Sequence, residues 1–361
     1  MQIDFANLKI QHNLYKEEIE EAILKVARDC NFIMGSQIDE LEKNLEKFTG
    51  SQYAISCSSG TDALLLAMMA LDIQPDDEII TTPFTFFATA ETIAFLKAKP
   101  VFVDIDEKTY NIDPKKIEEK ITPKTKAIIP VSLYGQPADM DEINQIAKNY
   151  NLKVLVDGAQ SFGSTYNGIS DSNLGDISCT SFFPAKPLGC YGDGGALFTN
   201  DEKLADKIKS LRLHGQSIRY HHQYIGMGGR LDTIQAAVLN VKLKYYPKDL
   251  KLRQDVASKY TKALNAKNIE TPFVKNDRTS AWAQYSIRVQ NRTELQTKLQ
   301  NLGIPTAVHY PMPLHVQECF VYLGYKKGDF PISEIVSEEI MSLPMNPYVT
   351  DEEIEYIVGN L

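Results

Sequence analysis

The chain has 361 residues, of which 43% are hydrophobic and 24% charged, as is typical of a globular protein with more than one domain. Its net charge of -9 excludes a general nucleic-acid binder, since such a protein needs a basic face to neutralise phosphates. The five cysteines are scattered without a C-x-x-C pair, which predicts reduced thiols in a cytoplasmic protein, no disulfide framework and no metal site. No apolar run reaches the roughly 18 residues of a membrane-spanning helix, so we expect no membrane association.

The first half of the chain alternates between two kinds of pattern. Amphipathic helices are predicted over residues 15–28 and 37–48. Short apolar runs typical of buried strands then alternate with helical patterns. We expect strands at 53–56, 78–81, 100–103, 127–130, 154–157 and 179–182, and helices at 61–71, 88–96 and 140–150. This alternation predicts an α/β fold with a largely parallel sheet.

The second half continues with a strand candidate at 194–199, which we expect to run antiparallel. A long helical region follows from about 230 to 265. Beyond it we expect a strand at 283–289 and helices at 292–302 and 332–341. These elements predict a large α/β domain over residues 1–240 and a smaller C-terminal α+β domain over residues 241–361.

Lys186 stands in a segment rich in aromatic residues and glycines, SFFPAKPLGCYGDGG from 181 to 195, with no other positive charge nearby. Most lone lysines are solvated surface charges, and that is the alternative here. Partial burial would lower the pKa of the lysine and leave a neutral amine that can form an imine. Lys186 is therefore a candidate catalytic residue.

Asp157 ends the apolar run 154–157, which has the character of a buried strand. An acid at the end of a strand often only caps the backbone. It can also pair with the protonated ring nitrogen of a bound cofactor, because a fixed carboxylate favours that charged form. We interpret Asp157 as a second candidate for the chemistry.

Residues 58–64, SSGTDAL, join a predicted strand to a predicted helix. Ser59, Gly60 and Thr61 would present hydroxyls and free backbone N–H groups at the helix start, which suits a phosphate, although a plain helix cap is the alternative. Ser181, near the lysine, would add a hydroxyl to the same phosphate.

Phe86, in the run PFTFFAT after a strand, offers a ring to stack on a flat cofactor; packing in the core is the commoner fate of such a ring.

With these four segments in this order, the chain resembles the DegT/DnrJ/EryC1/StrS sugar aminotransferases, which belong to the fold type I enzymes that use pyridoxal 5'-phosphate (PLP). The likeness extends from the Phe-Ile-Met-Gly segment at 32–35 to the His-Tyr-Pro segment at 309–311, and the lysine motif is its most specific part. Dehydratases of the family carry a histidine in place of this lysine, so Lys186 indicates a transaminase.

The resemblance also implies roles for the candidate residues. Lys186 would bind PLP as an imine, Asp157 would pair with the pyridine nitrogen, and Gln160 would lie against the cofactor's hydroxyl group. The phosphate would be held by Gly60, Thr61 and Ser181, with Ser59 in the same turn, and Phe86 would stack on the ring.

A narrower likeness covers residues 181–195, 230–233 and 307–311. They look much like the bacterial enzymes that aminate UDP-2-acetamido-2-deoxy-3-oxo-glucuronate at C3, on the route to surface polysaccharides. This implies that Arg230, His309 and Tyr310 bind the sugar's carboxylate and that L-glutamate is the amino donor. The alternatives are amination of a 4-keto-6-deoxy nucleotide sugar, and a PLP-fold regulatory protein that has lost catalysis, against which Lys186 and Asp157 argue.

One position departs from the family pattern. Many relatives have an asparagine two residues before the arginine, where it reaches the cofactor phosphate of the partner subunit, and this chain has Gly228 there. Either a backbone N–H replaces the amide, or fewer contacts hold the phosphate. The resemblance further implies a homodimer with shared active sites, in which Arg230 acts across the interface.

Overall fold

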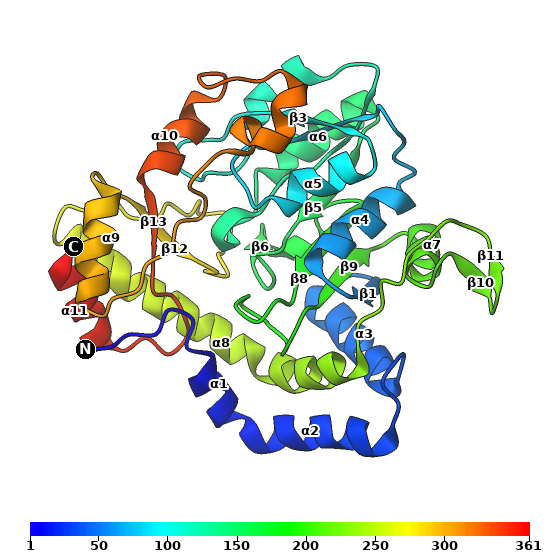
Figure 1. Ribbon diagram of the computed structural model, residues 1–361, viewed down its shortest axis with the longest axis horizontal. Helices are drawn as coiled ribbons and strands as arrows, with labels where there is room; N and C mark the ends of the chain where they lie inside the picture. The colour runs from blue at the N-terminus through cyan, green and yellow to red at the C-terminus, as the bar shows by residue number, and fades with distance from the viewer.

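A seven-stranded sheet forms the centre of the computed structural model, which describes residues 1–361 (Figure 1). Its strands lie in the order β1 (Tyr53–Cys57), β9 (Gly195–Thr199), β8 (Ile177–Ser181), β5 (Lys153–Asp157), β4 (Thr125–Ile128), β2 (Glu78–Thr81) and β3 (Lys99–Phe102). The neighbouring strands pair in parallel, except that β9 runs antiparallel to β1 and β8. The predicted α/β fold with a largely parallel sheet is confirmed, and so is the antiparallel strand at 194–199.

Helices cover both faces of this sheet. On one face of the sheet, a hydrophobic core packs the strands against α4, α5 and α7. The opposite face has two cores, one shared with α3 and α8 and the other shared with α6. Because apolar side chains are buried on both faces, the strands have nearly continuous apolar runs. The helices are α1 (Leu8–Leu14), α2 (Lys16–Asp29), α3 (Ser36–Thr49), α4 (Gly60–Ala70), α5 (Ala88–Phe95), α6 (Met140–Tyr150), α7 (Glu202–Arg212), α8 (Thr233–Asn265), α9 (Arg292–Asn301), α10 (Pro331–Glu339) and α11 (Asp351–Asn360). None of them combines the length and the apolar character needed to cross a membrane.

The long helix α8 leads from the sheet to a smaller C-terminal part (Figure 1). There β12 (Tyr285–Arg288) and β13 (Ile340–Leu343) pair antiparallel and share a separate core with α9, α11 and the end of α8. Ile3 belongs to the same core, so the first residues of the chain lie beside its C-terminal helices. The division at residue 240 stays a prediction, and α8 runs through that residue without interruption.

The structure corrects the prediction for one segment and adds elements that were not predicted. The helix expected at 332–341 ends at Glu339, and the chain then enters β13, whose four residues are buried against β12. Pairing with a distant strand overrides the local helical pattern. The helices α7 and α11 were not predicted, nor was the hairpin of β10 (Gln216–Ile218) and β11 (His221–His222), which projects at the right edge of Figure 1.

Candidate active site

The predicted site residues meet at one edge of the sheet. Asp157 is the last residue of β5 and Ser181 the last of β8, while the segments after β1 and β2 lead to Gly60 and Phe86. Parallel strands place their carboxyl ends at the same edge, which is where open α/β sheets bind ligands. Segments far apart in the sequence are therefore brought together by the sheet order.

Asp157 is buried, with 5% of its surface exposed. Its Oδ2 accepts a hydrogen bond from the Thr89 hydroxyl at 2.7 Å, and its Oδ1 accepts one from the Ala159 N–H at 3.2 Å. Burial raises the pKa of Asp157, and the two hydrogen bonds and the charge of Lys186 oppose that rise. A carboxylate in these surroundings is stabilised by a cationic partner.

Lys186 lies in the loop between β8 and β9 and is half-buried, as predicted. Its backbone N–H donates to the Phe183 carbonyl at 2.8 Å, which closes a tight turn. Burial lowers the pKa of Lys186, and the negative charge of Asp157 offsets part of that effect. A lysine whose pKa is lowered next to an acid whose pKa is raised is the pattern expected of groups that transfer protons.

The turn from β1 to α4 offers free backbone donors. The Ser59 hydroxyl accepts the Asp62 N–H at 3.0 Å, so Ser59 caps the helix, which was the alternative for this motif. The N–H groups of Gly60 and Thr61 find no acceptor within the chain. A Cβ on Gly60 would lie 2.7 Å from the Cβ of Ser181, so only glycine allows the turn to approach β8 so closely. The resulting cradle of N–H groups and hydroxyls suits a phosphate.

Gln160 connects this edge of the sheet to the segment that carries His309 and Tyr310. Its Oε1 accepts the Tyr134 N–H at 2.7 Å, and its Nε2 donates to the Tyr310 hydroxyl at 3.0 Å. The Tyr134 hydroxyl donates in turn to the His309 carbonyl. These contacts connect both predicted substrate residues to Gln160 and Tyr134. The charge of Asp157 adds to the effect of burial in raising the pKa of Tyr310.

His309 and Phe86 flank the same network. The Nδ1 of His309 lies 2.8 Å from the Ser342 hydroxyl. Burial and the positive charge of Lys186 lower the pKa of His309 to about 4, so its ring is neutral at pH 7. Phe86 is 53% exposed, and its ring centroid lies 5.9 Å from that of Tyr310. This ring is open to a flat ligand rather than packed in the core.

Arg230 makes no hydrogen bond with His309 or Tyr310 within the chain; their side chains contact Ser342 and Gln160 instead. It is half-buried, and the carbonyl of the preceding Gly229 accepts the Ser58 N–H at 3.0 Å. A Cβ on Gly228 would lie 3.1 Å from the His214 ring and 3.8 Å from the Arg230 guanidinium. The His214 ring therefore occupies the space next to Gly228.

Two residues of the site were missed in the sequence analysis. Thr89, which bonds Asp157 and lies 3.0 Å from the Thr85 hydroxyl, is the second residue of α5. Tyr134, which bonds Gln160 and His309, adopts a positive φ of 58° in the turn after β4. The Tyr-Gly pair at 134–135 is the signal that could have indicated a special turn.

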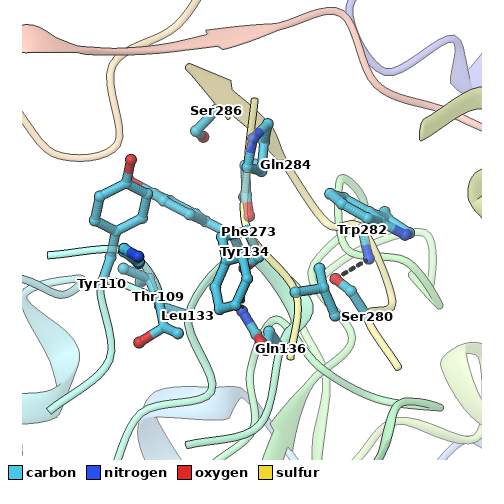
Figure 2. Close-up of a pocket in the computed structure, with 13 residues that line it drawn as sticks. Thr109, Tyr110, Leu133, Tyr134, Gln136, Phe273, Ser280, Trp282, Gln284 and Ser286 are labelled. Atoms are coloured by element: carbon cyan, nitrogen blue, oxygen red, sulfur yellow. Dashed lines mark hydrogen bonds between the residues drawn. The ribbon is translucent and has the colours of Figure 1, made fainter. Parts of the chain in front are cut away.

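A small pocket lies next to Tyr134 (Figure 2). Tyr110, Gln136, Trp282 and Gln284 contribute to its walls, and the amide oxygen of Gln284 has no hydrogen-bond partner. Its cavity volume is about 20 Å³, which accommodates a water but not a sugar. The pocket thus belongs to the packing behind the site. Nowhere do three or more His, Cys, Asp or Glu side chains assemble into a group that could hold a metal ion.

The model of the DegT/DnrJ/EryC1/StrS aminotransferase family matches residues 13–361. The chain belongs to this family. A relative from Pseudomonas aeruginosa, named UDP-2-acetamido-2-deoxy-3-oxo-D-glucuronate aminotransferase, is 49% identical over 99% of both chains. A crystal structure of a DegT/DnrJ/EryC1/StrS aminotransferase from Brucella abortus is 39% identical, covers 99% of this chain and 98% of its own, and has a TM-score of 0.96.

A second solved structure bears on the cofactor of this aminotransferase family. NtdA from Bacillus subtilis, solved with bound cofactor PMP, is 31% identical to this chain, covers 99% of it and 84% of its own length, and has a TM-score of 0.91. The predictions of the family, of the fold and of an aminotransferase are confirmed. The roles of the individual site residues stay predictions.

Proposed function

We propose that this aminotransferase moves an amino group from L-glutamate to C3 of a UDP-linked 3-keto-2-acetamido uronic acid, with PLP as its cofactor. The observation that carries the proposal is one site in which a lysine of lowered pKa lies within the electrostatic reach of a buried carboxylate. The substrate follows from the full-length relative at 49% identity, whose name contains that keto-sugar.

The residues present fit PLP. The cradle at Gly60 is open only because glycine stands there, and its free N–H groups match a phosphate. When bound, PLP supplies an electron sink for the carbon that carries the amine. The phosphate would be held by Ser59, Gly60, Thr61 and Ser181, the pyridine nitrogen by Asp157, the ring hydroxyl by Gln160 and the ring face by Phe86.

Lys186 moves the proton in both halves of the reaction. Burial lowers the pKa of its amine, so that the neutral form is accessible. In the first half, its Nζ removes the proton from the α-carbon of L-glutamate. In the second half, Nζ delivers a proton to C3 of the sugar. The Thr89 hydroxyl and the Ala159 N–H bond the oxygens of Asp157 and favour its negative form.

The carboxylate of the uronic acid would be bound by Arg230, His309 and Tyr310. A guanidinium offers a planar fork that matches a carboxylate, and the neutral His309 ring has one nitrogen left after its contact with Ser342. Because Arg230 makes no hydrogen bond with the other two within a chain, we propose a homodimer in which it reaches the site of the partner.

The exposed apolar side chains near Arg230 support this dimer. Ile218 and Tyr220 on the hairpin and Ile225 after it are 71%, 79% and 93% exposed. Exposed apolar groups clustered on one projecting segment are typical of a surface that a partner covers. The product would serve the cytoplasmic synthesis of diamino uronic acids for a bacterial surface polysaccharide, such as lipopolysaccharide O-antigen.

The test is an absorbance spectrum of the PLP-loaded protein, taken before and after L-glutamate and again after the UDP-linked 3-keto uronic acid. Loss of the lysine-bound cofactor band with glutamate and its return with this sugar are expected. If the band returns only with a 4-keto-6-deoxy nucleotide sugar, then that sugar is the substrate. Arg230, His309 and Tyr310 would then have other roles. A band that glutamate leaves unchanged would indicate a regulatory protein without catalysis.

A further inference from the structure

Lys242 is a buried lysine for which the proposed reaction has no role. It lies on α8 with 4% of its surface exposed. Its Nζ donates a hydrogen bond to the carbonyl oxygen of Gly189, a residue that is itself buried. Burying an ammonium without an acidic hydrogen-bond partner costs free energy. The hydrogen bond from Lys242 to the Gly189 carbonyl therefore differs from the solvated contacts of a surface lysine.

Gly189 belongs to the loop that carries Lys186. A Cβ on Gly189 would lie 2.5 Å from the Pro184 carbonyl oxygen and 2.7 Å from that of Phe183. The loop therefore folds back tightly on the residues just before Lys186. The Cys190 N–H donates to the Phe182 carbonyl at 2.8 Å and closes the loop. Any shift of the Gly189 carbonyl is transmitted to the backbone of Lys186.

The same helix holds this loop at a second point. The Tyr191 N–H donates to Oε1 of Gln235 at 2.8 Å, and the ring of Tyr191 lies 5.6 Å from the ammonium of Lys242. Gln235 and Lys242 are seven residues apart, which places them on one face of α8, two turns from each other. The loop is thus attached to α8 at two points, the Gly189 carbonyl and the Tyr191 N–H.

We infer that Lys242 is a positioning residue for Lys186: its Nζ, bonded to the Gly189 carbonyl, fixes the loop of residues 182–192 on α8 and with it the reactive amine. The inference rests on the proposed function, because it assumes that Lys186 transfers the proton. The role needs no contact between Lys242 and substrate or cofactor.

The charge of Lys242 gives the contact a pH dependence with a definite sign. Burial lowers its pKa from 10.5 to about 8; Cys190 of the loop and Asp249 of α8 raise it, and Arg253 of α8 lowers it further. The ring of Tyr191 faces it from the loop. The open loop therefore binds the proton more tightly than the closed loop, so the closed form gains stability as the pH rises from 8 toward 10.5.

Hydrogen exchange on the PLP-loaded enzyme tests this coupling. The amides of Lys186 and Cys190 report loop opening, since each is hydrogen-bonded within the loop. After correction for intrinsic rates, their protection is expected to rise about tenfold between pH 7 and pH 9 in the wild type. Lys242→Met should lose this pH dependence. Lys248→Met, an exposed lysine of the same helix, should keep it.

Steady-state kinetics complete the test. Lys242→Met is expected to lower kcat about tenfold with the KM for L-glutamate unchanged, since it disturbs the amine and not the binding groups. The inference is overturned if Lys242→Met follows the wild-type exchange profile and matches Lys248→Met in kcat. Turnover by Lys186→Ala would instead overturn the proposed function, so the two failures are distinguishable.

Discussion

At the scale of single residues, the site is defined by two groups whose pKa values burial moves in opposite directions. The pKa of Asp157 is raised and that of Lys186 is lowered, and each charge opposes the shift of the other. Neither group can be removed without changing the protonation of its partner. Burial raises the pKa of Asp157, and the hydrogen bonds to its oxygens oppose that rise because they stabilise the negative form.

Thr89→Val tests the role of those hydrogen bonds. The substitution keeps the shape but removes the donor 2.7 Å from Oδ2, so the pKa of Asp157 should rise further. A hydrogen bond to a charged group contributes roughly 1.5–3 kcal/mol, which corresponds to a loss of about tenfold or more in kcat. Steady-state kinetics measure it. Thr92→Val, which removes a hydroxyl bonded to the Ala88 carbonyl instead, is the control and should retain activity.

His309 makes stability depend on pH. Its pKa falls from 6.5 to about 4 on folding, so between these values the unfolded chain binds a proton that the folded chain does not. The free energy of unfolding should therefore decrease as the pH drops from 6.5 to 4, by on the order of 3 kcal/mol at most. Urea denaturation at about pH 7 and pH 4.5 measures this. His309→Gln should show a smaller decrease; the same decrease in wild type and variant would contradict the argument.

The candidate residues with local signals could be found from the sequence, and those defined by distant partners could not. Lys186 stands in a conspicuous glycine-rich segment, and Asp157 ends an apolar run. Thr89 and Tyr134 have no such pattern: their partners Asp157 and His309 are 68 and 175 residues away along the chain. Only the fold shows that they meet.

At the scale of elements, the start of α4 and the end of β8 form one unit. Their separation is set by Gly60, whose missing side chain lets the turn reach Ser181. The N–H groups of the first helical turn then point at open space rather than at protein acceptors. The helix start would therefore lose its proposed role as a phosphate site if the two elements moved apart.

Gly60→Ala tests this contact between elements. The added Cβ would lie 2.7 Å from the Cβ and 3.2 Å from the Cα of Ser181, so backbone must move. The dissociation constant for PLP, measured by equilibrium dialysis, is expected to rise at least about tenfold, which is the loss of one charge-assisted hydrogen bond. Gly359→Ala, where a Cβ meets nothing within 4 Å, is the control. Unchanged PLP affinity in Gly60→Ala would contradict the phosphate assignment.

Whether a helix or strand could be predicted depended on how far apart along the chain the residues that stabilise it are. The strands of the sheet are apolar runs bounded by turns, and each was found within two residues. The helix predicted at 332–341 extends two residues into β13, because the pairing of β13 with β12 is a contact between distant parts of the chain. The helix α11 had a local signal that was overlooked, the capping box of Thr350 and Glu353.

At the scale of the whole molecule, no hydrogen bond connects Arg230 with the other proposed substrate residues of its own chain. Lys186, Asp157, His309 and Tyr310 gather at the sheet edge, whereas Arg230 lies beside Gly228 and His214, close to the hairpin that projects from the body. In the proposed homodimer, the arginine of a second chain would complete the carboxylate site with His309 and Tyr310, giving two equivalent sites.

Mixing two inactive variants decides between one chain and two. Lys186→Ala and Arg230→Ala should each lack turnover of the keto-sugar alone. In a mixed dimer, one of the two sites combines the intact Lys186 of one chain with the intact Arg230 of the other. If subunits exchange freely, half of the dimers are mixed, so about a quarter of the wild-type activity is expected to return. If Arg230 serves its own chain, both sites of every mixed dimer lack one residue and no activity returns. That result would place the arginine in the site of its own subunit, and the dimer would no longer be needed to explain the chemistry.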